Sequence, residues 1–578
     1  MIISIKSIVV ALVASVPFVL TLSAQDQRFG VQMHLAQGWN QSLIPQAARA
    51  GVGSVRDELY WGNIEQTRGN FTFPKMYDDY MAALAANNIS PLIELDFSNP
   101  NYDGGNAPYD DDGFNGYANY CTQVLDHYGD QIQAVEIWNE YDVTTYTGGP
   151  ALADLADTYL GMLQAAYPAI KASHPNVTVV GGGTPWLDLP FWEELCAAGG
   201  LDYLDVASIH PYRYDQPPEG IQDEIFQLRN IMKTYNHGEE KPIWATEVGW
   251  YTSGDQYSVT PAQQANYLVR AYALLMAAGV DRVYWYLYRD NPEIDYGCSL
   301  GLVQEDDNQT TKPAYKAMAT MSSFLQGAHF VRAEGGLGGP AYSILFQRDD
   351  GTELRVMWAT TPTTIYAAGA VSEQDLNGNY LTMDGYLYLK GSPLFVTGPL
   401  NGGFPNQYGT VLANSLDDFS GGQGSNSWSY GVYLGGTLFA PLGSFARPTD
   451  QAAYWADNFT GLYLTGADQT TSFTGLFGAT PVASVRRWTS NYDGNVQISG
   501  SFKTEQTGGD GVGVKVVVDG RVLQRVLLGG GNSSTTWKFN LTSTVHQGST
   551  IDFAVDPGSS TDYSYDATAV SATITSKP

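Results

Sequence analysis

Two glutamates, each at the end of an apolar run, are the residues best placed to do chemistry. Glu140 closes the run Ala134–Glu140, which ends in Trp-Asn-Glu, and Glu247 closes Pro242–Glu247. A pair of carboxyl groups can hydrolyse a glycosidic bond, because one protonates the leaving oxygen while the other, ionised, attacks the anomeric carbon or activates water. Asn139, beside the first glutamate, could bind the sugar 2-hydroxyl. The chemistry to expect from this pair is hydrolysis of a glycosidic bond.

The elements that must position these glutamates are eight apolar, β-rich runs that alternate with helical patterns. The runs are Phe29–His34, Val52–Asp57, Pro91–Asp96, Ala134–Glu140, Val177–Gly181, Leu204–His210, Pro242–Glu247 and Val283–Tyr288. Eight such units predict an α/β fold, a (β/α)8 TIM barrel, whose catalytic groups project from the carboxyl ends of the strands. A doubly wound open sheet is the alternative, but it would require a Gly-rich phosphate turn after the first strand, where the sequence has His34–Gly38.

Helical periodicity fills the segments between the runs. The clearest predicted helices are Met76–Ala86, Tyr117–Tyr128, Ala151–Ser173, Ile221–Tyr235 and Pro261–Ala278. The last of them has signals at both ends, with Thr260 as N-cap, Pro261 at the first helical position and Gly279 just past the end. Strands followed by helices of this length are what a barrel requires.

The helical period stops after Gln326, and β-type patterns take over. Tyr342–Phe346 and Leu354–Trp358 flank the turn residues Asp349-Asp350-Gly351, which predicts a hairpin. Further on, short strands are punctuated by Gly, which is typical of a β-sandwich or jelly roll. The predicted organisation is a signal peptide at 1–24, a catalytic barrel at 25–328, a small β-sandwich at 329–400 and a larger C-terminal β-sandwich at 401–578, a candidate carbohydrate-binding module.

The amino terminus and the cysteines indicate the compartment. Lys6, the apolar run Ile8–Leu22 and the small residues Ser23-Ala24 are typical of a secretory signal peptide. We therefore expect a secreted, extracellular or periplasmic protein with no membrane association after signal cleavage. Three cysteines exclude a disulfide scaffold and a Cys-rich zinc module. The oligomeric state is not predicted.

Charge and aromatic content restrict the partners. The chain has 29 Lys plus Arg against 59 Asp plus Glu, and 13% of its residues are aromatic. A balance this acidic argues against nucleic acid, whereas aromatic and uncharged polar groups suit a carbohydrate substrate. Residues 401–578 hold 9 basic and 13 acidic residues, a net of −4, so the first 400 residues carry the remaining −26 of the total of −30. This acidity favours a neutral glycan over an anionic one.

The two glutamate segments resemble those of a known enzyme family. Trp138-Asn139-Glu140 and Thr246–Trp250 are similar to family 39 of the glycoside hydrolases, in the clan of retaining enzymes with glutamates on barrel strands four and seven. The resemblance covers about residues 29–330, and 329–398 is similar to the small β domain of that group. It implies Glu140 as acid/base and Glu247 as nucleophile. Family members commonly carry Pro after Asn-Glu, where this chain has Tyr141, so the substrate stays open.

Other residues near the strand ends are candidates for substrate binding. Arg56 could hydrogen-bond the nucleophile and keep it ionised, or form a structural ion pair. A tyrosine such as Tyr212 orients the nucleophile in related families, and a Trp at the position of Trp285 stacks on the sugar, although core packing is the alternative for the latter. The predicted substrate-binding residues are Asn139, His34, Arg56, His210, Tyr212, Trp250 and Trp285.

Three other patterns point elsewhere. Gly297–Gly301 matches the G-x-S-x-G elbow of serine hydrolases, but its flanks are loop-like. Asp110–Gly113 resembles a calcium loop with its remaining ligands out of register, and the seven His show no metal spacing, so no metal and no cofactor are predicted. Trp428 and Tyr430 share a strand face and could stack on sugar or pack in a core.

A non-catalytic carbohydrate-binding or adhesin protein on a barrel scaffold is the alternative function.

Overall fold

The fold is that of a computed structural model, which describes residues 25–577 except 294, 335–340, 368, 401–410, 417, 421, 435–436, 447–453, 457–465, 469, 474, 478–479, 506–510, 530–533 and 559–565. The predicted signal peptide, 1–24, lies outside the described residues. Within the described ranges, no helix combines the length and the apolar character that a membrane crossing requires.

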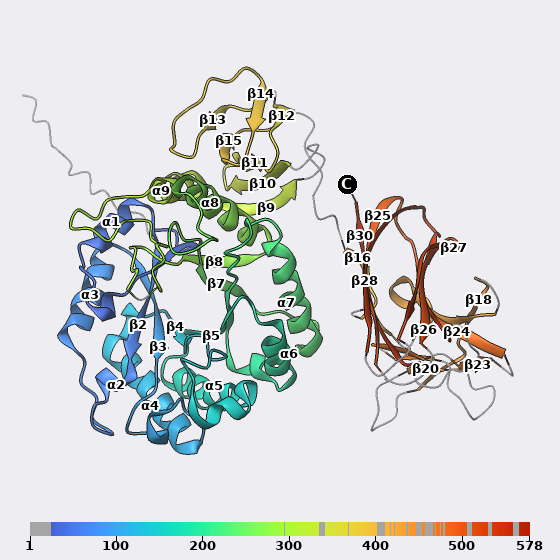
Figure 1. Ribbon diagram of the computed structural model, residues 1–578, viewed down its shortest axis with the longest axis horizontal. Helices are drawn as coiled ribbons and strands as arrows, with labels where there is room; N and C mark the ends of the chain where they lie inside the picture. The colour runs from blue at the N-terminus through green and yellow to red at the C-terminus, as the bar shows by residue number, and fades with distance from the viewer. Residues whose placement is uncertain are drawn as a thin grey trace, which may run out of the picture.

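The first eight strands form a closed parallel barrel (Figure 1). They are β1 Phe29–Gln32, β2 Ser54–Tyr60, β3 Ser90–Asp96, β4 Ala134–Ile137, β5 Thr178–Pro185, β6 Val206–His210, β7 Ile243–Val248 and β8 Val280–Trp285. Each strand pairs with the next, and β8 pairs with β1, where Gly30 lies opposite Tyr284. The predicted (β/α)8 barrel is confirmed, and the open sheet is excluded because the ring closes.

Helices surround the barrel, as the sequence predicts. They are α1 Leu43–Arg49, α2 Trp61–Ile64, α3 Lys75–Ala86, α4 Asp111–Tyr128, α5 Leu155–Ser173, α6 Leu189–Ala197, α7 Ile221–Tyr235, α8 Pro261–Ala277 and α9 Pro313–Leu325. Thr260 and Gln263 form a reciprocal capping box at the start of α8. Helix α4 begins earlier than predicted because the Asp110 side chain accepts hydrogen bonds from the backbone N–H groups of Asp112 and Gly113. The residues that resemble a calcium loop, Asp110–Gly113, therefore form the N-terminal cap of α4.

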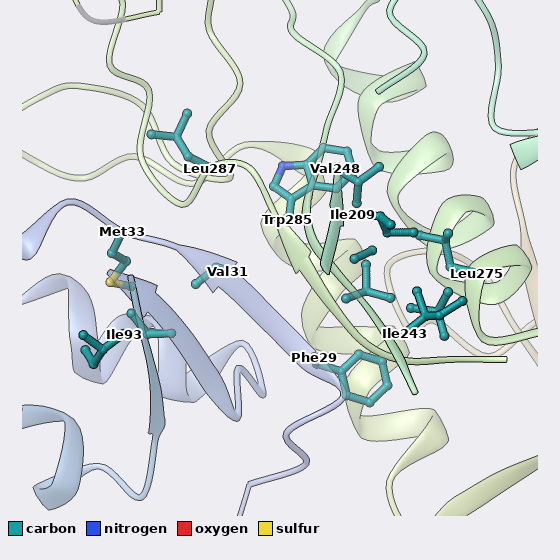
Figure 2. Close-up of a cluster of buried hydrophobic side chains, with 14 of the residues drawn as sticks. Phe29, Val31, Met33, Ile93, Ile209, Ile243, Val248, Leu275, Trp285 and Leu287 are labelled. Carbon is teal, nitrogen blue, oxygen red and sulfur yellow. The ribbon is translucent and has the colours of Figure 1, made fainter. Parts of the chain in front are cut away.

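Strand alternation separates the packed outer face of the barrel from a polar interior. Phe29, Val31 and Met33 belong to the buried apolar cluster shown in Figure 2. Because successive side chains of a strand point to opposite faces, Gln32 is directed into the barrel instead. His34, just past the strand, contacts Glu58 of β2. Further down, a small cluster of buried apolar residues fills the inside of the barrel: Leu92, Ala134, Val180, Val206, Trp244 and Tyr284. The acidic side chains that surround Arg56 lie above this cluster, towards the carboxyl ends of the strands.

Antiparallel sheets follow the barrel, beside helices α8 and α9 in Figure 1. Their strands are β9 Ala328–Glu334, β10 Ala341–Arg348, β11 Glu353–Ala359, β12 Thr363–Tyr366, β13 Ser372–Gln374, β14 Tyr386–Leu389 and β15 Leu394–Thr397. The predicted hairpin is β10 paired with β11. Trp358 donates its indole N–H to Glu219 at 2.7 Å, and Arg270 of α8 bonds the same carboxylate, so a buried polar contact joins sheet and barrel.

The C-terminal strands form two further antiparallel sheets. They are β16 Val411–Asn414, β17 Trp428–Tyr433, β18 Phe439–Pro441, β19 Ser444–Ala446, β20 Tyr454–Ala456, β21 Gly466–Asp468, β22 Thr471–Phe473, β23 Gly475–Phe477, β24 Thr480–Thr489, β25 Gly494–Thr504, β26 Val512–Val518, β27 Arg521–Leu528, β28 Thr536–Val545, β29 Thr550–Asp556 and β30 Thr568–Ser576. Trp428 and Tyr430 are fully buried in this core, against Phe553 and Trp455. Of the two readings of these aromatic residues, core packing is therefore the one observed.

Candidate active site

Glu247 lies near the end of β7 and is held by two donors. Its Oε1 accepts a hydrogen bond from Arg56 Nη1 at 2.6 Å, and its Oε2 accepts one from the Tyr212 hydroxyl at 2.6 Å. Burial opposes ionisation, but the charges of His210 and Arg56 and the bond from Tyr212 outweigh it and lower the pKa of Glu247. An ionised, immobilised carboxylate is suited to nucleophilic attack.

Glu140 reaches the site because the chain leaves β4 early. The strand ends at Ile137, before the predicted boundary, and Trp138 and Glu140 take positive φ angles of 64° and 47°. Such angles are uncommon for residues other than glycine, and here a hydrogen bond from Glu140 N to Gly183 O at 3.0 Å fixes the turn. Glu140 Oε1 lies 2.9 Å from His210 Nδ1. The irregular turn thus aims the carboxyl group at the barrel centre.

The pKa of Glu140 shifts in the direction opposite to that of Glu247. Burial raises the pKa of Glu140, and the negative charge of Glu247 raises it further, against the opposing effect of His210. One oxygen of each glutamate lies within 4.8 Å of the other and of a His210 ring nitrogen. Two carboxyl groups this close, with pKa shifts in opposite directions, suit a proton donor and an ionised carboxylate that act on the same bond.

Arg56, on β2, connects the acidic groups of the barrel interior. Its fully buried guanidinium bonds Glu136 at 2.6 Å and Glu94 at 2.9 Å besides Glu247. It also donates to Asn139 Oδ1 at 3.0 Å. That bond uses the amide oxygen of Asn139 and leaves its NH2 group to donate elsewhere. Arg56 therefore makes both of the contacts expected from the sequence, since it forms structural ion pairs inside the barrel and also hydrogen-bonds Glu247.

His210, at the end of β6, lies between the two glutamates. Its Nε2 lies 3.0 Å from Thr246 Oγ1, and its Nδ1 lies 3.8 Å from Glu247 besides contacting Glu140. Burial lowers the pKa of His210, but the two carboxylates outweigh burial and raise it. The imidazole therefore balances the charge of the glutamate pair. His34 also reaches the barrel mouth, where its Nδ1 lies 2.7 Å from Glu58.

Two predicted site residues lie elsewhere. Trp250 and Trp285 are only 1% and 0% exposed, and their rings pack against each other at 6.1 Å. Their indole N–H groups donate to backbone oxygens, Trp250 to Arg213 and Trp285 to Leu300. Figure 2 shows Trp285 within the apolar cluster. The prediction that these two residues contact the sugar is corrected, because packing covers their ring faces; they instead support the ends of β7 and β8.

Tyr141, where the resembled family has Pro, continues the packing behind Glu140. It is buried, donates its hydroxyl to Pro108 O at 3.2 Å, and lies edge-on to Trp138 at 5.7 Å. Its ring also contacts Tyr159 of α5 at 5.0 Å. This aromatic stack stabilises the turn that carries Glu140. Tyr141 therefore supports the turn at the position where the resembled family has proline.

The glutamates and His210 could also act as cation ligands, since one atom of each lies within 4.8 Å of the others. However, Arg56 already occupies one oxygen of Glu247, and its positive charge opposes a second cation there. The arrangement fits acid–base chemistry better. The G-x-S-x-G match lies in turns between β8 and α9, where the Ser299 hydroxyl accepts a hydrogen bond from Ser253, so these residues form no strand–elbow–helix unit. The three cysteines are free thiols.

Sequence reasoning missed several acidic residues of the site. Glu58 lies two positions after Arg56 on β2, and Glu94 lies on β3, both within buried strands. Alternate positions of a strand share a face, so the two-residue spacing puts Glu58 on the same face as Arg56 and could have found it. Asp295, which bonds Tyr286 at 2.9 Å, lies in the long segment after β8 and had no such signal.

A closed (β/α)8 barrel that holds two glutamates with opposite pKa shifts at the ends of β4 and β7 has the architecture of a glycoside hydrolase. Residues 113–313 match the family model described as glycosyl hydrolase catalytic core, a span that contains Glu140, His210 and Glu247. This match supports a glycoside hydrolase, the enzyme class to which the resemblance in the sequence pointed. No curated protein sequence matches the chain.

Three solved structures are similar to this chain. A family 39 glycoside hydrolase from the gut symbiont Bacteroides cellulosilyticus WH2 is similar with a TM-score of 0.56 and 23% identity, over 65% of this chain and 81% of that one. A family 39 β-xylosidase from Caulobacter crescentus has a TM-score of 0.46 and 15% identity, over 65% and 96%. A family 39 enzyme from Xanthomonas axonopodis pv. citri has a TM-score of 0.43 and 13% identity, over 92% and 94%.

Proposed function

We propose that this protein is a secreted, retaining glycoside hydrolase that cleaves O-glycosidic bonds of a neutral poly- or oligosaccharide. The observation that carries the proposal is the pair Glu140 and Glu247, which lie in contact with one histidine and have pKa shifts of opposite sign. The family-model match over residues 113–313 supports the reaction class. The sequence of the first 24 residues supports secretion, and the net charge of −26 over the first 400 residues supports a neutral substrate.

The proposed reaction is a double displacement. Glu247 attacks the anomeric carbon while Glu140 protonates the leaving oxygen, which gives a covalent glycosyl-enzyme. Formation of that ester removes the charge of Glu247, one of the causes that raise the pKa of Glu140. Glu140, which has given its proton to the leaving group, therefore stays ionised and, as a base, takes a proton from the water that releases the sugar. The same carboxyl group can therefore serve in both steps.

Arg56 and Tyr212 are proposed to position the nucleophile. They bond different oxygens of Glu247, which fixes the plane of the carboxylate. Asn139, held through its oxygen by Arg56, is proposed to donate from its NH2 group to the sugar. We further propose that 25–328 is the catalytic domain, followed by β-sandwich domains at 329–400 and 401–578.

Substitution of each glutamate tests the assignment. Glu247→Gln is expected to abolish turnover, whereas Glu140→Gln should keep slow cleavage of aryl glycosides with activated leaving groups, which need no proton. Glu305→Gln, which removes an exposed carboxylate, is the matched control and should retain full activity. NMR of the first product should show the anomeric configuration of the substrate. An inverted product, or full activity of either catalytic variant on the natural glycan, would contradict the proposal.

A further inference from the structure

Beside the glutamate pair, three side chains converge from three different elements with part of their bonding capacity unused. His34 follows β1, Glu58 lies on β2 and Asp295 follows β8. Among the described residues, His34 Nε2, Glu58 Oε2 and Asp295 Oδ2 are buried and have no hydrogen-bond partner. Unsatisfied buried polar atoms are costly, and at functional sites they are often completed by a ligand.

The opposite atoms of the same side chains are fixed. Glu58 Oε1 lies 2.7 Å from His34 Nδ1 and also accepts from Gln37 Nε2 at 3.3 Å. Asp295 Oδ1 accepts from the Tyr286 hydroxyl at 2.9 Å. Each carboxylate is thus oriented by one oxygen while the other oxygen is left for something else. That is the arrangement of a preorganised binding group.

These groups face the same space as Glu247. Burial lowers the pKa of His34, but the charges of Glu58, Asp295 and Glu247 outweigh it and raise the pKa, so all three carboxylates act on one imidazole. The Tyr286 ring lies 6.0 Å from that of His34 and 6.4 Å from that of Tyr212, which bonds Glu247. The cluster is therefore continuous with the nucleophile.

Small exposed areas place the cluster at the barrel mouth. His34 and Glu58 are 5% exposed and Asp295 is 8% exposed, similar to Glu247 at 6%, whereas Arg56 below them is completely covered. Nearby cations are engaged with other acids, since Arg56 is bonded to Glu94, Glu136 and Glu247, and Arg289 pairs with Glu305. The mouth on this side thus offers acceptors and negative charge.

We propose that Glu58 and Asp295 bind hydroxyl groups of the sugar next to Glu247 and exclude sugars that carry a carboxylate. This inference rests on the proposed glycosidase function and adds its substrate selection. Hydroxyl groups donate to the free carboxylate oxygens, whereas a uronic acid would bring a further negative charge against two carboxylates. Glu58 and Asp295 are therefore specificity-determining residues for a neutral sugar.

The test compares aryl β-glucosides and β-xylosides with the aryl β-glucuronide in the full-length protein. The wild type should cleave a neutral glycoside at least about 100-fold more efficiently than the glucuronide, as expected where like charges meet in a buried site. Glu58→Gln and Asp295→Asn should each lower kcat/KM for the neutral substrate about 10- to 100-fold, the effect of losing a hydrogen bond to a charged group. Each variant should also narrow the discrimination against the glucuronide about tenfold or more.

Controls separate selection from stability and from catalysis as such. Asp307→Asn removes one exposed carboxylate after β8 and should leave the discrimination ratio unchanged. If a variant unfolds, as its melting temperature would show, the wild-type protein alone tests the inference. Its kcat/KM for the neutral glycoside must then exceed that for the glucuronide by the expected factor. The inference would be overturned if folded variants kept the activity and the discrimination ratio of the wild type, or if the wild type cleaved the glucuronide efficiently. Either result would leave the proposed function standing. Failure of the wild type to hydrolyse any glycan would overturn both.

Discussion

The hydroxyl of Tyr212 is the donor whose removal should change catalysis with the least damage to the fold. Tyr212→Phe keeps the ring, which lies 4.9 Å from that of Tyr214, and deletes only the 2.6 Å hydrogen bond to Glu247 Oε2. The bond is one of the causes that lower the pKa of Glu247. Without it, the pKa of Glu247 should rise.

The size of the effect follows from the strength of the bond. A hydrogen bond to a charged group contributes about 1.5–3 kcal/mol, and one pKa unit corresponds to about 1.36 kcal/mol. The reaction requires ionised Glu247, so activity is lost as pH falls through its pKa. The acid limb of the profile of kcat/KM against pH should therefore move to higher pH by about 1–2 units in Tyr212→Phe.

The assay is the pH dependence of kcat/KM on an activated aryl glycoside. Tyr251→Phe is the matched control, because Tyr251 follows the same strand as Glu247 and donates to Asp255 instead. Its acid limb should coincide with that of the wild type. An acid limb that stays in place in folded Tyr212→Phe would refute Glu247 as the ionised group of the reaction.

Three further predictions concern the same network and the barrel that holds it. His210→Asn should move both limbs of the pH profile to higher pH, because His210 lowers the pKa of Glu140 and of Glu247; an unmoved basic limb would separate Glu140 from the proton-donating step. Arg56→Lys should lower the free energy of unfolding by about 3–5 kcal/mol, as measured by urea denaturation, because one ammonium cannot replace the bonds to three carboxylates; a loss below 1 kcal/mol would contradict the network. Thr260→Ala should cost about 1 kcal/mol through the lost cap of α8 and leave kcat unchanged, and a changed kcat would mean that α8 is coupled to the site.

The sequence predicted the barrel because its signal is local and repeated. Continuous apolar strands alternate with amphipathic helices, and α7 coincides with the predicted Ile221–Tyr235. Boundaries shifted where a side chain decides them, as at Asp110, whose carboxylate caps α4. The shape of the strand ends was less accessible. The predicted β4 continued to Glu140, whereas positive φ angles at Trp138 and Glu140 end it at Ile137.

From the sequence, a residue could be assigned to the site only if it lies near the end of a predicted strand. Glu140, Glu247, His210 and Tyr212 lie at or just past strand ends, Arg56 lies within β2, and the structure brings all five together. Trp250 and Trp285 share that position in the sequence, but packing between segments turned them into the core, which strand position does not reveal. Asp295 depends on the path of a long segment after β8, so no local pattern marks it.

Covalent trapping of the nucleophile tests the central claim most directly. A 2-deoxy-2-fluoro glycoside with an activated leaving group, in the configuration of the neutral sugar that the protein cleaves, should form a stable ester that protease digestion and mass spectrometry locate. The account predicts one label per chain, on the peptide that contains Glu247, and no label in Glu247→Gln. Labelling of another residue, or turnover of the natural glycan without any trapped intermediate, would contradict it.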